Sequence, residues 1–186
     1  MNTVQHILSE LNHFAEAIDQ GEIDTIVQKL ITAKQQGKRI FLAGAGRSGC
    51  VVKAFTNRLM HVGFTCYLVG DITTPPIQQG DILFLLSGSG KTTSLVNMAR
   101  KAKEVQASIL TITLQKEGDI AQMSDALILL PGTTRLQNNP TCTSIQPVGS
   151  CFEQLSFLTC DGIILQLRDQ LHMQNEDMLK HHANLE

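Results

Sequence analysis

The apolar residues of this chain follow two spacings, one typical of helices and one typical of buried strands. Near the N-terminus, apolar residues from Val4 to Ile18 recur every three or four positions, which predicts an amphipathic helix, and a second helix is expected over residues 23–36. From Arg39 onward, short apolar runs predict strands near residues 39–43, 65–69, 82–86, 108–113 and 126–130. Helical patterns alternate with them near residues 48–62, 92–104, 117–123, 149–172 and 175–183.

This alternation predicts an α/β fold in which a mainly parallel sheet is covered by helices on both faces. Two connections depart from it: residues 71–80 join two strands without an evident helix, and residues 131–147 form a long polar loop. We expect that long loop to form a wall or flap of a binding site. We expect one domain over residues 1–186, with N-terminal helices (2–36) and C-terminal helices (149–183) that pack on it or on neighbouring subunits.

Composition and charge indicate a folded domain and argue against nucleic-acid and membrane partners. A hydrophobic content of 42% and a charged content of 17% exclude general disorder, and 186 residues are enough for one domain with a sizeable core. The net charge is −2, the basic residues are scattered, and the chain has one Tyr and no Trp, so we expect no nucleic-acid surface. No apolar stretch reaches the roughly 18 residues of a membrane-spanning helix. We therefore expect no membrane contact, no signal peptide and a cytoplasmic location.

The cysteines and histidines do not predict a metal site. None of the cysteines forms a C-x-x-C pair, and reduced thiols are the favoured interpretation; they are Cys50, Cys66, Cys142, Cys151 and Cys160. His181 and His182 are adjacent, so their side chains would point to different sides of a helix, and no third ligand stands nearby.

Two glycine-rich loops with hydroxyl side chains directly follow two of the predicted strands. The first is GAGRSG at residues 44–49, and the second is SGSGKTTS at residues 87–94. A strand–loop–helix junction of this kind exposes backbone N–H groups at a helix N-terminus, where they attract anions. Hydroxyl donors suited to phosphate oxygens are available on Ser48, Ser87, Ser89 and Thr92. Two such loops predict a phosphorylated small molecule as the ligand.

Two nucleotide-binding motifs overlap these loops, and we favour neither. The first loop matches the dinucleotide fingerprint G-x-G-x-x-G, and Asp71 stands about where a ribose-binding acid is expected. However, the second strand reaches the third without the crossover helix of a dinucleotide fold, and a dinucleotide gives the second loop no role. Residues 89–92 resemble the end of a Walker A loop, but its first glycine would fall on Leu85.

Two further side chains stand out by their positions. Glu153 follows the long polar loop at the start of a predicted helix, where an acid either complements the helix dipole or serves as a functional group. His61 stands at the end of a predicted helix, where a histidine is commonly found without a catalytic role. The residues alone leave both alternatives open.

At these residues the chain resembles the sugar isomerase (SIS) domain, and more narrowly the 6-phospho-3-hexuloisomerases. The two glycine loops carry the broad resemblance; residues 58–64, 146–153 and 182–186 carry the narrower one, which covers nearly the whole chain. The resemblance implies a three-layer α/β/α sandwich around a five-stranded parallel sheet of flavodoxin-like topology, usually assembled as a homotetramer. Position 91 departs from the family pattern, because Lys91 stands where Glu is frequent.

The resemblance also implies a reaction. Family members interconvert D-arabino-hex-3-ulose 6-phosphate and D-fructose 6-phosphate through an enediolate, without a metal or another cofactor, in the ribulose monophosphate pathway of formaldehyde fixation. It implies that Glu153 is the catalytic base and that His61 moves a second proton or assists ring opening, within its subunit or across a subunit boundary. The substrate-binding residues that it implies are Gly46, Arg47, Ser48, Ser87, Gly88, Ser89 and Thr92.

Two alternatives from the same fold remain open. One is a non-catalytic SIS module that senses sugar phosphates, although such modules often accompany a DNA-binding domain, and this chain has no basic helix for one. The other is an SIS isomerase for another aldose or ketose phosphate. The sequence also leaves open whether His182 and Glu186 reach a neighbouring active site, and whether the reaction assimilates or detoxifies formaldehyde.

Overall fold

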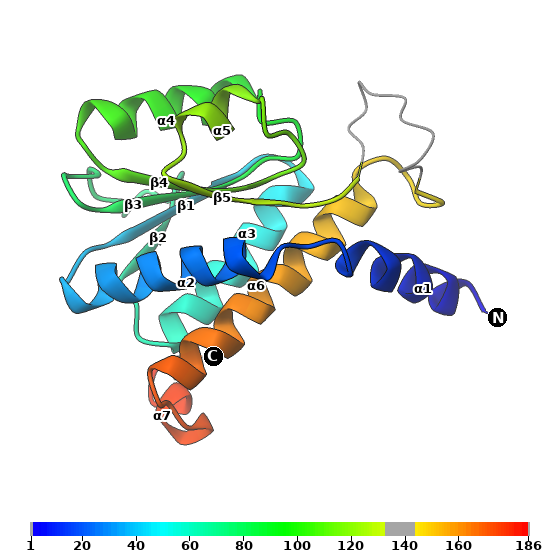
Figure 1. Ribbon diagram of the computed structural model, residues 1–186. Helices are drawn as coiled ribbons and strands as arrows, with labels where there is room; N and C mark the ends of the chain where they lie inside the picture. Colours follow the sequence, from blue (N-terminus) through cyan, green and yellow to red (C-terminus); the bar gives the residue numbers. More distant parts are fainter. Residues whose placement is uncertain (1, 133–143, 186) are drawn as a thin grey trace.

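The fold is built around one five-stranded parallel sheet. A computed structural model describes residues 2–132 and 144–185 of the chain (Figure 1). The strands are ordered β2-β1-β3-β4-β5 and pair in parallel throughout. Their bounds are β1 Ile40–Gly44, β2 Cys66–Leu68, β3 Ile82–Leu86, β4 Ser108–Thr113 and β5 Ala126–Leu129. This strand order is the flavodoxin-like one, as the resemblance implied.

Helices cover both faces of the sheet and complete the expected three-layer sandwich (Figure 1). Their bounds are α1 Thr3–Ala15, α2 Gln20–Gln35, α3 Arg47–His61, α4 Thr93–Glu104, α5 Asp119–Met123, α6 Ser150–Gln170 and α7 Asn175–Leu179. Helices α4 and α5 lie on one face, and α2, α3 and α6 lie on the other. None of the helices in the described ranges is long and apolar enough to cross a membrane.

The strands are continuous apolar runs because the sheet is buried on both sides. All five residues of β3 are buried, and alternate residues enter different cores. Phe84 packs with α2, α3 and α6, whereas Leu83 and Leu85 pack with α4 and α5. Successive side chains of a strand point to opposite faces of the sheet, and here an apolar layer covers each face.

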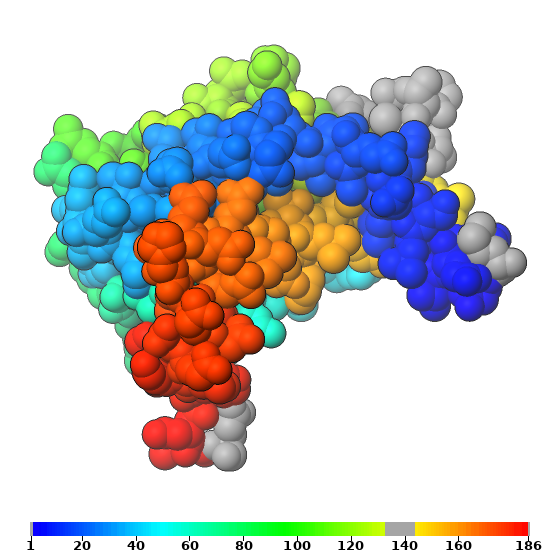
Figure 2. All heavy atoms as spheres, turned by 60° about the horizontal axis from the view of Figure 1, so that its bottom comes forward, coloured from blue at the N-terminus to red at the C-terminus, as the bar shows by residue number. Residues whose placement is uncertain are grey.

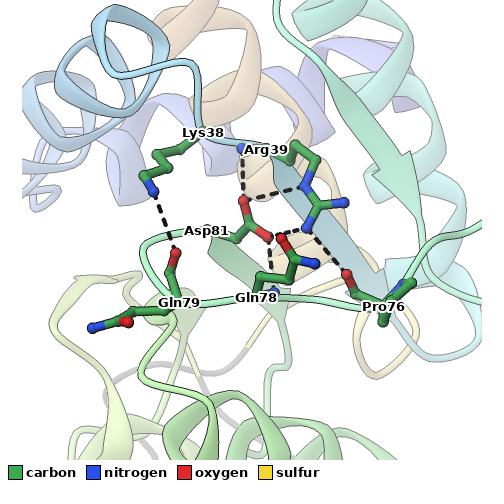
Figure 3. A network of polar contacts seen from close by, with 6 residues as sticks. All are labelled: Lys38, Arg39, Pro76, Gln78, Gln79 and Asp81. Carbon is green, nitrogen blue, oxygen red and sulfur yellow. Dashed lines mark hydrogen bonds and ion pairs between the residues drawn. The ribbon is translucent and has the colours of Figure 1, made fainter.

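A polar network ties together the amino-terminal ends of β1 and β3 (Figure 3). The carboxylate of Asp81, which is buried, accepts hydrogen bonds from the backbone N–H of Arg39 at 3.0 Å and from its guanidinium at 2.6 Å. The amide N–H of Gln78 also donates to this carboxylate, and Arg39 donates to the carbonyl of Pro76. Although burial acts to raise the pKa of Asp81, the hydrogen bonds and charge of Arg39 hold it below its ordinary value. The network fixes the helix-free connection before β3.

The N-terminal helix stands out from the body of the molecule. Figures 1 and 2 show α1 projecting at one side, next to the start of α6, and the C-terminal residues projecting at the far end of α6. Leu11 and Phe14 anchor α1 in the core, while Val4 and Leu8 are exposed. The exposed side of α6 is also apolar, with its large side chains at Phe157, Leu158 and Leu165.

Candidate active site

The two glycine-rich loops lie side by side at the carboxyl ends of neighbouring strands. Gly44, the last residue of β1, is the partner of Leu86, the last residue of β3. The first loop therefore leaves the sheet next to the second. In open parallel sheets, this edge is where ligands bind.

Close backbone contacts explain the glycines of the first loop. A Cβ atom on Gly49 would lie 2.8 Å from the carbonyl oxygen of Gly44, and one on Gly44 would lie 2.9 Å from the backbone of Ser48. Gly46 has a φ of 57° and caps α3 without a side-chain hydrogen bond. The first turn of α3 therefore presents its N–H groups at the carboxyl edge of the sheet, where an anion would be stabilised.

The second loop carries hydroxyl groups that few protein groups engage. Ser87 is buried, and its Oγ has no hydrogen-bond partner among the residues that the structure describes. Ser89 Oγ accepts a hydrogen bond from the backbone N–H of Lys91 at 3.3 Å, while the Lys91 side chain is exposed. Thr92 caps α4, but its side chain makes no capping hydrogen bond. A buried hydroxyl without a partner is costly, so Ser87 is suited to an incoming acceptor such as a phosphate oxygen.

Glu153 meets Arg47 beside these loops. Arg47 Nε lies 3.0 Å from Glu153 Oε2, and Arg47 Nη1 donates to Ser150 Oγ at 2.9 Å. The Glu153 side chain is only 16% exposed, whereas that of Arg47 is 63% exposed. The carboxylate is thus held in place, and the guanidinium has room to move toward a ligand.

The first turn of α6 also reaches the second loop. A Cβ atom on Gly88 would lie 3.2 Å from a ring carbon of Phe152, which leaves space at that position for glycine alone without a shift. The expected site residues Arg47, Ser87, Gly88 and Glu153 are therefore brought together in one region. Ser150 was missed by the sequence analysis, although a serine at the start of a helix next to a polar loop is a recognisable signal.

Gly149 is a second residue of the site that the sequence analysis missed. It precedes α6 with a φ of 94°, a conformation that favours glycine, and a Cβ there would lie 3.5 Å from Glu153 Oε1. The turn at Gly149 therefore directs the chain into the helix that carries the carboxylate. The expected loop wall over residues 131–147 falls largely on residues 133–143, which lie outside the described residues.

His61 does not join this site within one chain. It is the last residue of α3, so it lies about 21 Å along the helix axis from Arg47 at 1.5 Å per residue. His61 is buried, and its ring stacks on that of His182 with the centroids 4.6 Å apart. Burial lowers the pKa of His61, and the charges of His182 and Arg58 lower it further. His61 and Arg47, the partner of Glu153, therefore lie at opposite ends of α3.

His61 borders a separate pocket of about 320 Å³ at that end of α3. Its lining includes Arg58, Asp161, His182 and the exposed Phe157 of α6. Among the described residues, no group of three or more His, Cys, Asp or Glu side chains is placed to hold a metal ion.

Comparison with known proteins fits this geometry. The family model of the SIS domain matches residues 35–156, which span the whole sheet and the start of α6. The chain belongs to the SIS domain family. It is 42% identical to the 3-hexulose-6-phosphate isomerase of Bacillus subtilis, over 98% of this chain and 97% of that protein. It is 34% identical to the 3-hexulose-6-phosphate isomerase of Mycobacterium gastri, over 100% of this chain and 90% of that protein.

A solved structure confirms the SIS fold of the chain. The structure of a Methanococcus jannaschii protein, described as inferring the function of a 3-hexulose-6-phosphate isomerase, superposes with a TM-score of 0.80. The two are 32% identical, over 98% of this chain and 96% of that one. Within the SIS domain family, the chain therefore groups with the 3-hexulose-6-phosphate isomerases, as residues 58–64, 146–153 and 182–186 indicated.

Proposed function

We propose that this chain is a 3-hexulose-6-phosphate isomerase, which interconverts D-arabino-hex-3-ulose 6-phosphate and D-fructose 6-phosphate. The observation that carries the proposal is the Arg47–Glu153 pair, which stands beside two loops suited to a phosphate. Full-length relatives that bear this enzyme's name support the choice of substrate.

The reaction moves a carbonyl group from C3 to C2, so a proton must leave C2 and another must arrive at C3. Glu153 takes the C2 proton, which gives a 2,3-enediolate, and the same carboxyl group then delivers a proton to C3. A positioned carboxylate contributes about 10²–10⁴-fold in such a step. The low exposure of Glu153 supports this role, because it keeps the carboxylate in a fixed place.

Arg47 stabilises the negative charge of the enediolate oxygens. Its guanidinium already lies against Glu153 and Ser150, so a small movement of this exposed side chain would bring it to the substrate. A cation at the place where negative charge develops lowers the free energy of the transition state.

The phosphate group binds between the two loops. The amides around Gly46 and Gly88 and the hydroxyls of Ser48, Ser87, Ser89 and Thr92 are the proposed donors. Within the described part of the chain, Ser87 Oγ has no hydrogen-bond partner and the N-terminus of α3 has no side-chain cap, and both observations support this assignment. Phosphate held away from the reacting carbons supplies binding energy that orients them.

His61 acts from a neighbouring subunit of a homotetramer in this proposal. Its distance from Arg47 along α3 supports a role in a neighbour's site rather than in that of its own subunit. The exposed apolar side of α6 supports an interface at this place, since Phe157 both borders the His61 pocket and is exposed. The lowered pKa of His61 suits a neutral ring, which can donate one proton and accept another between the two substrate oxygens.

The reaction belongs to the ribulose monophosphate pathway of formaldehyde fixation, and we place the protein in the cytoplasm, where sugar phosphates are retained. The test is a coupled assay in which formaldehyde and ribulose 5-phosphate generate the hexulose phosphate and NADPH formation reports fructose 6-phosphate. Arabinose 5-phosphate and sedoheptulose 7-phosphate are assayed beside it, with and without EDTA. Turnover restricted to the hexulose phosphate supports the proposal. Thermal stabilisation by sugar phosphates without turnover would favour a sensing module instead.

A further inference from the structure

A carboxylate on α1 accepts three hydrogen bonds from the segment that leads into α6, the helix that carries Glu153. Oε1 of Glu10 accepts from the backbone N–H of Ile145 at 2.7 Å. Oε2 accepts from Ser144 Oγ at 3.1 Å and from Gln146 Nε2 at 2.8 Å. The backbone N–H of Gln146 in turn donates to Ser144 Oγ at 3.0 Å, which closes a small network around one carboxylate.

This network lies immediately before the residues that form the site. Only Pro147 and Val148 separate Gln146 from Gly149, and the N–H of Ser150 donates to the carbonyl of Pro147 at 3.0 Å. The positive φ of Gly149 then begins α6, whose first turn holds Ser150 and Glu153 against Arg47. A shift of residues 144–146 would therefore be transmitted to the start of α6 through a short and tightly turned stretch.

Glu10 is itself well anchored. Leu11, the next residue, is buried in the core that α1 shares with α6. Burial raises the pKa of the Cys151 thiol, in the first turn of α6, to about 11, and the negative charge of Glu10 contributes to this rise. Through the carboxylate of Glu10, α1 thus holds the segment that leads into the N-terminus of α6.

We propose that Glu10 is a positioning residue: its carboxylate fixes residues 144–146 so that Glu153 meets Arg47 at the carboxyl edge of the sheet. The proposal rests on the function proposed above, in which Glu153 is the base. Glu10 touches neither of the phosphate-binding loops in the described contacts, so its effect falls on the chemical step rather than on substrate binding.

The test compares Glu10→Ala, Glu10→Gln and Glu16→Gln. Glu16 is the matched control because it lies at the end of the same helix, is exposed, and contacts the side chain of Asn12. Glu10→Ala is expected to lower kcat about 10–100-fold with a KM within about threefold of the wild type, because a misplaced catalytic group costs rate. Glu10→Gln keeps an acceptor for the Ile145 N–H, so its kcat should lie between those of Glu10→Ala and the wild type. The kcat of Glu16→Gln should match that of the wild type.

Two further readouts separate positioning from a general loss of structure. In a double-mutant cycle, Glu10→Ala should cause little additional loss of kcat when Glu153 is already Gln, since both changes act on the same group. Hydrogen exchange should increase in residues 144–150 of Glu10→Ala, with strands β1 and β3 unchanged.

Three results would overturn the proposal: a kcat of Glu10→Ala equal to that of Glu16→Gln, full additivity with Glu153→Gln, or unchanged exchange over residues 144–150. An inactive wild-type chain would instead refute the proposed function. Hydrogen exchange would then decide alone whether Glu10 holds this segment.

Discussion

Arg47 and Glu153 come from different helices, yet Arg47 Nε lies 3.0 Å from Glu153 Oε2 at the carboxyl edge of the sheet. The pairing places an exposed cation against a largely buried carboxylate. Arg47 also bonds Ser150, so its guanidinium joins the first turns of α3 and α6. A substrate that enters between the two glycine loops would meet both charges at once.

Replacing Arg47 should therefore reduce catalysis more than stability. Arg47→Ala is expected to lower kcat/KM by about 10²–10³-fold, since removal of one stabilising donor commonly has this effect. Arg47→Lys should lose less, because it keeps the charge but lacks the planar fork that reaches Ser150 and Glu153 together. Steady-state kinetics measures both, with Lys53→Ala, an exposed residue on the same helix, as the control. Equal kcat/KM values for Arg47→Ala and Lys53→Ala would refute the role.

Ser87 offers a test in which binding and stability respond in different directions. Because its Oγ is buried and has no partner within the described residues, Ser87→Ala should leave the free energy of unfolding unchanged or slightly higher. The same change should raise KM about tenfold if the hydroxyl binds phosphate. Urea denaturation and steady-state kinetics supply the two numbers, with Ser108→Ala at the opposite end of the sheet as the control. A destabilised variant with normal KM would show that the hydroxyl serves the fold instead.

A shared active site predicts complementation between two inactive variants. In a symmetric interface, subunits with Glu153→Gln and subunits with His61→Asn restore one intact site in each mixed pair, so co-expression should recover about a quarter of wild-type activity. Each variant alone should stay at least a hundredfold below the wild type. Activity of the mixed sample no higher than the two variants alone would mean that His61 does not serve a neighbour's site.

The Asp81–Arg39 network should make stability depend on pH at the acid end. The pKa of Asp81 lies below its ordinary value in the folded protein, so the folded state binds this proton less readily than the unfolded state. The contribution of Asp81 is therefore complete at neutral pH and is lost as pH falls below about 4. Asp81→Asn should lower the free energy of unfolding by about 1–3 kcal/mol at pH 7.

Urea denaturation at pH 7 and pH 3 measures this dependence. The difference between wild type and Asp81→Asn should shrink at pH 3, because the carboxyl group takes up a proton more readily in the unfolded chain than in the folded protein. Asp71→Asn, an exposed acid in the same connection, should show neither effect. If the two proteins differ in their free energy of unfolding by the same amount at both pH values, the packing of Asp81 rather than its charge stabilises the fold.

The sheet and the phosphate loops could be predicted because each has a local cause. Strands buried on both faces need continuous apolar runs such as Ile82–Leu86, and backbone approaches as close as that of Gly44 and Gly49 admit only glycine. The loops then had to meet, because β1 and β3 end in register. The placement of the loops at the carboxyl edge follows from these elements, whereas the strand order was implied by the family resemblance.

The contacts between distant segments could not be predicted in the same way. The hydrogen bonds from residues 144–146 to Glu10 depend on how α1 packs on α6, and no periodicity encodes that packing. The separation of His61 from Glu153 did have a signal in the sequence, since a helix that starts at the first loop and ends at His61 must carry that residue away from the site.

The most direct test of the central claim is the reaction in deuterium oxide, followed by NMR, for the wild-type chain and for Glu153→Gln. The account predicts that the wild type converts the hexulose phosphate to fructose 6-phosphate that carries solvent deuterium at C3. It predicts that Glu153→Gln, still folded and still stabilised by fructose 6-phosphate, turns over about 10²–10⁴-fold more slowly. Turnover of Glu153→Gln at the wild-type rate, with the same deuterium content at C3, would contradict it.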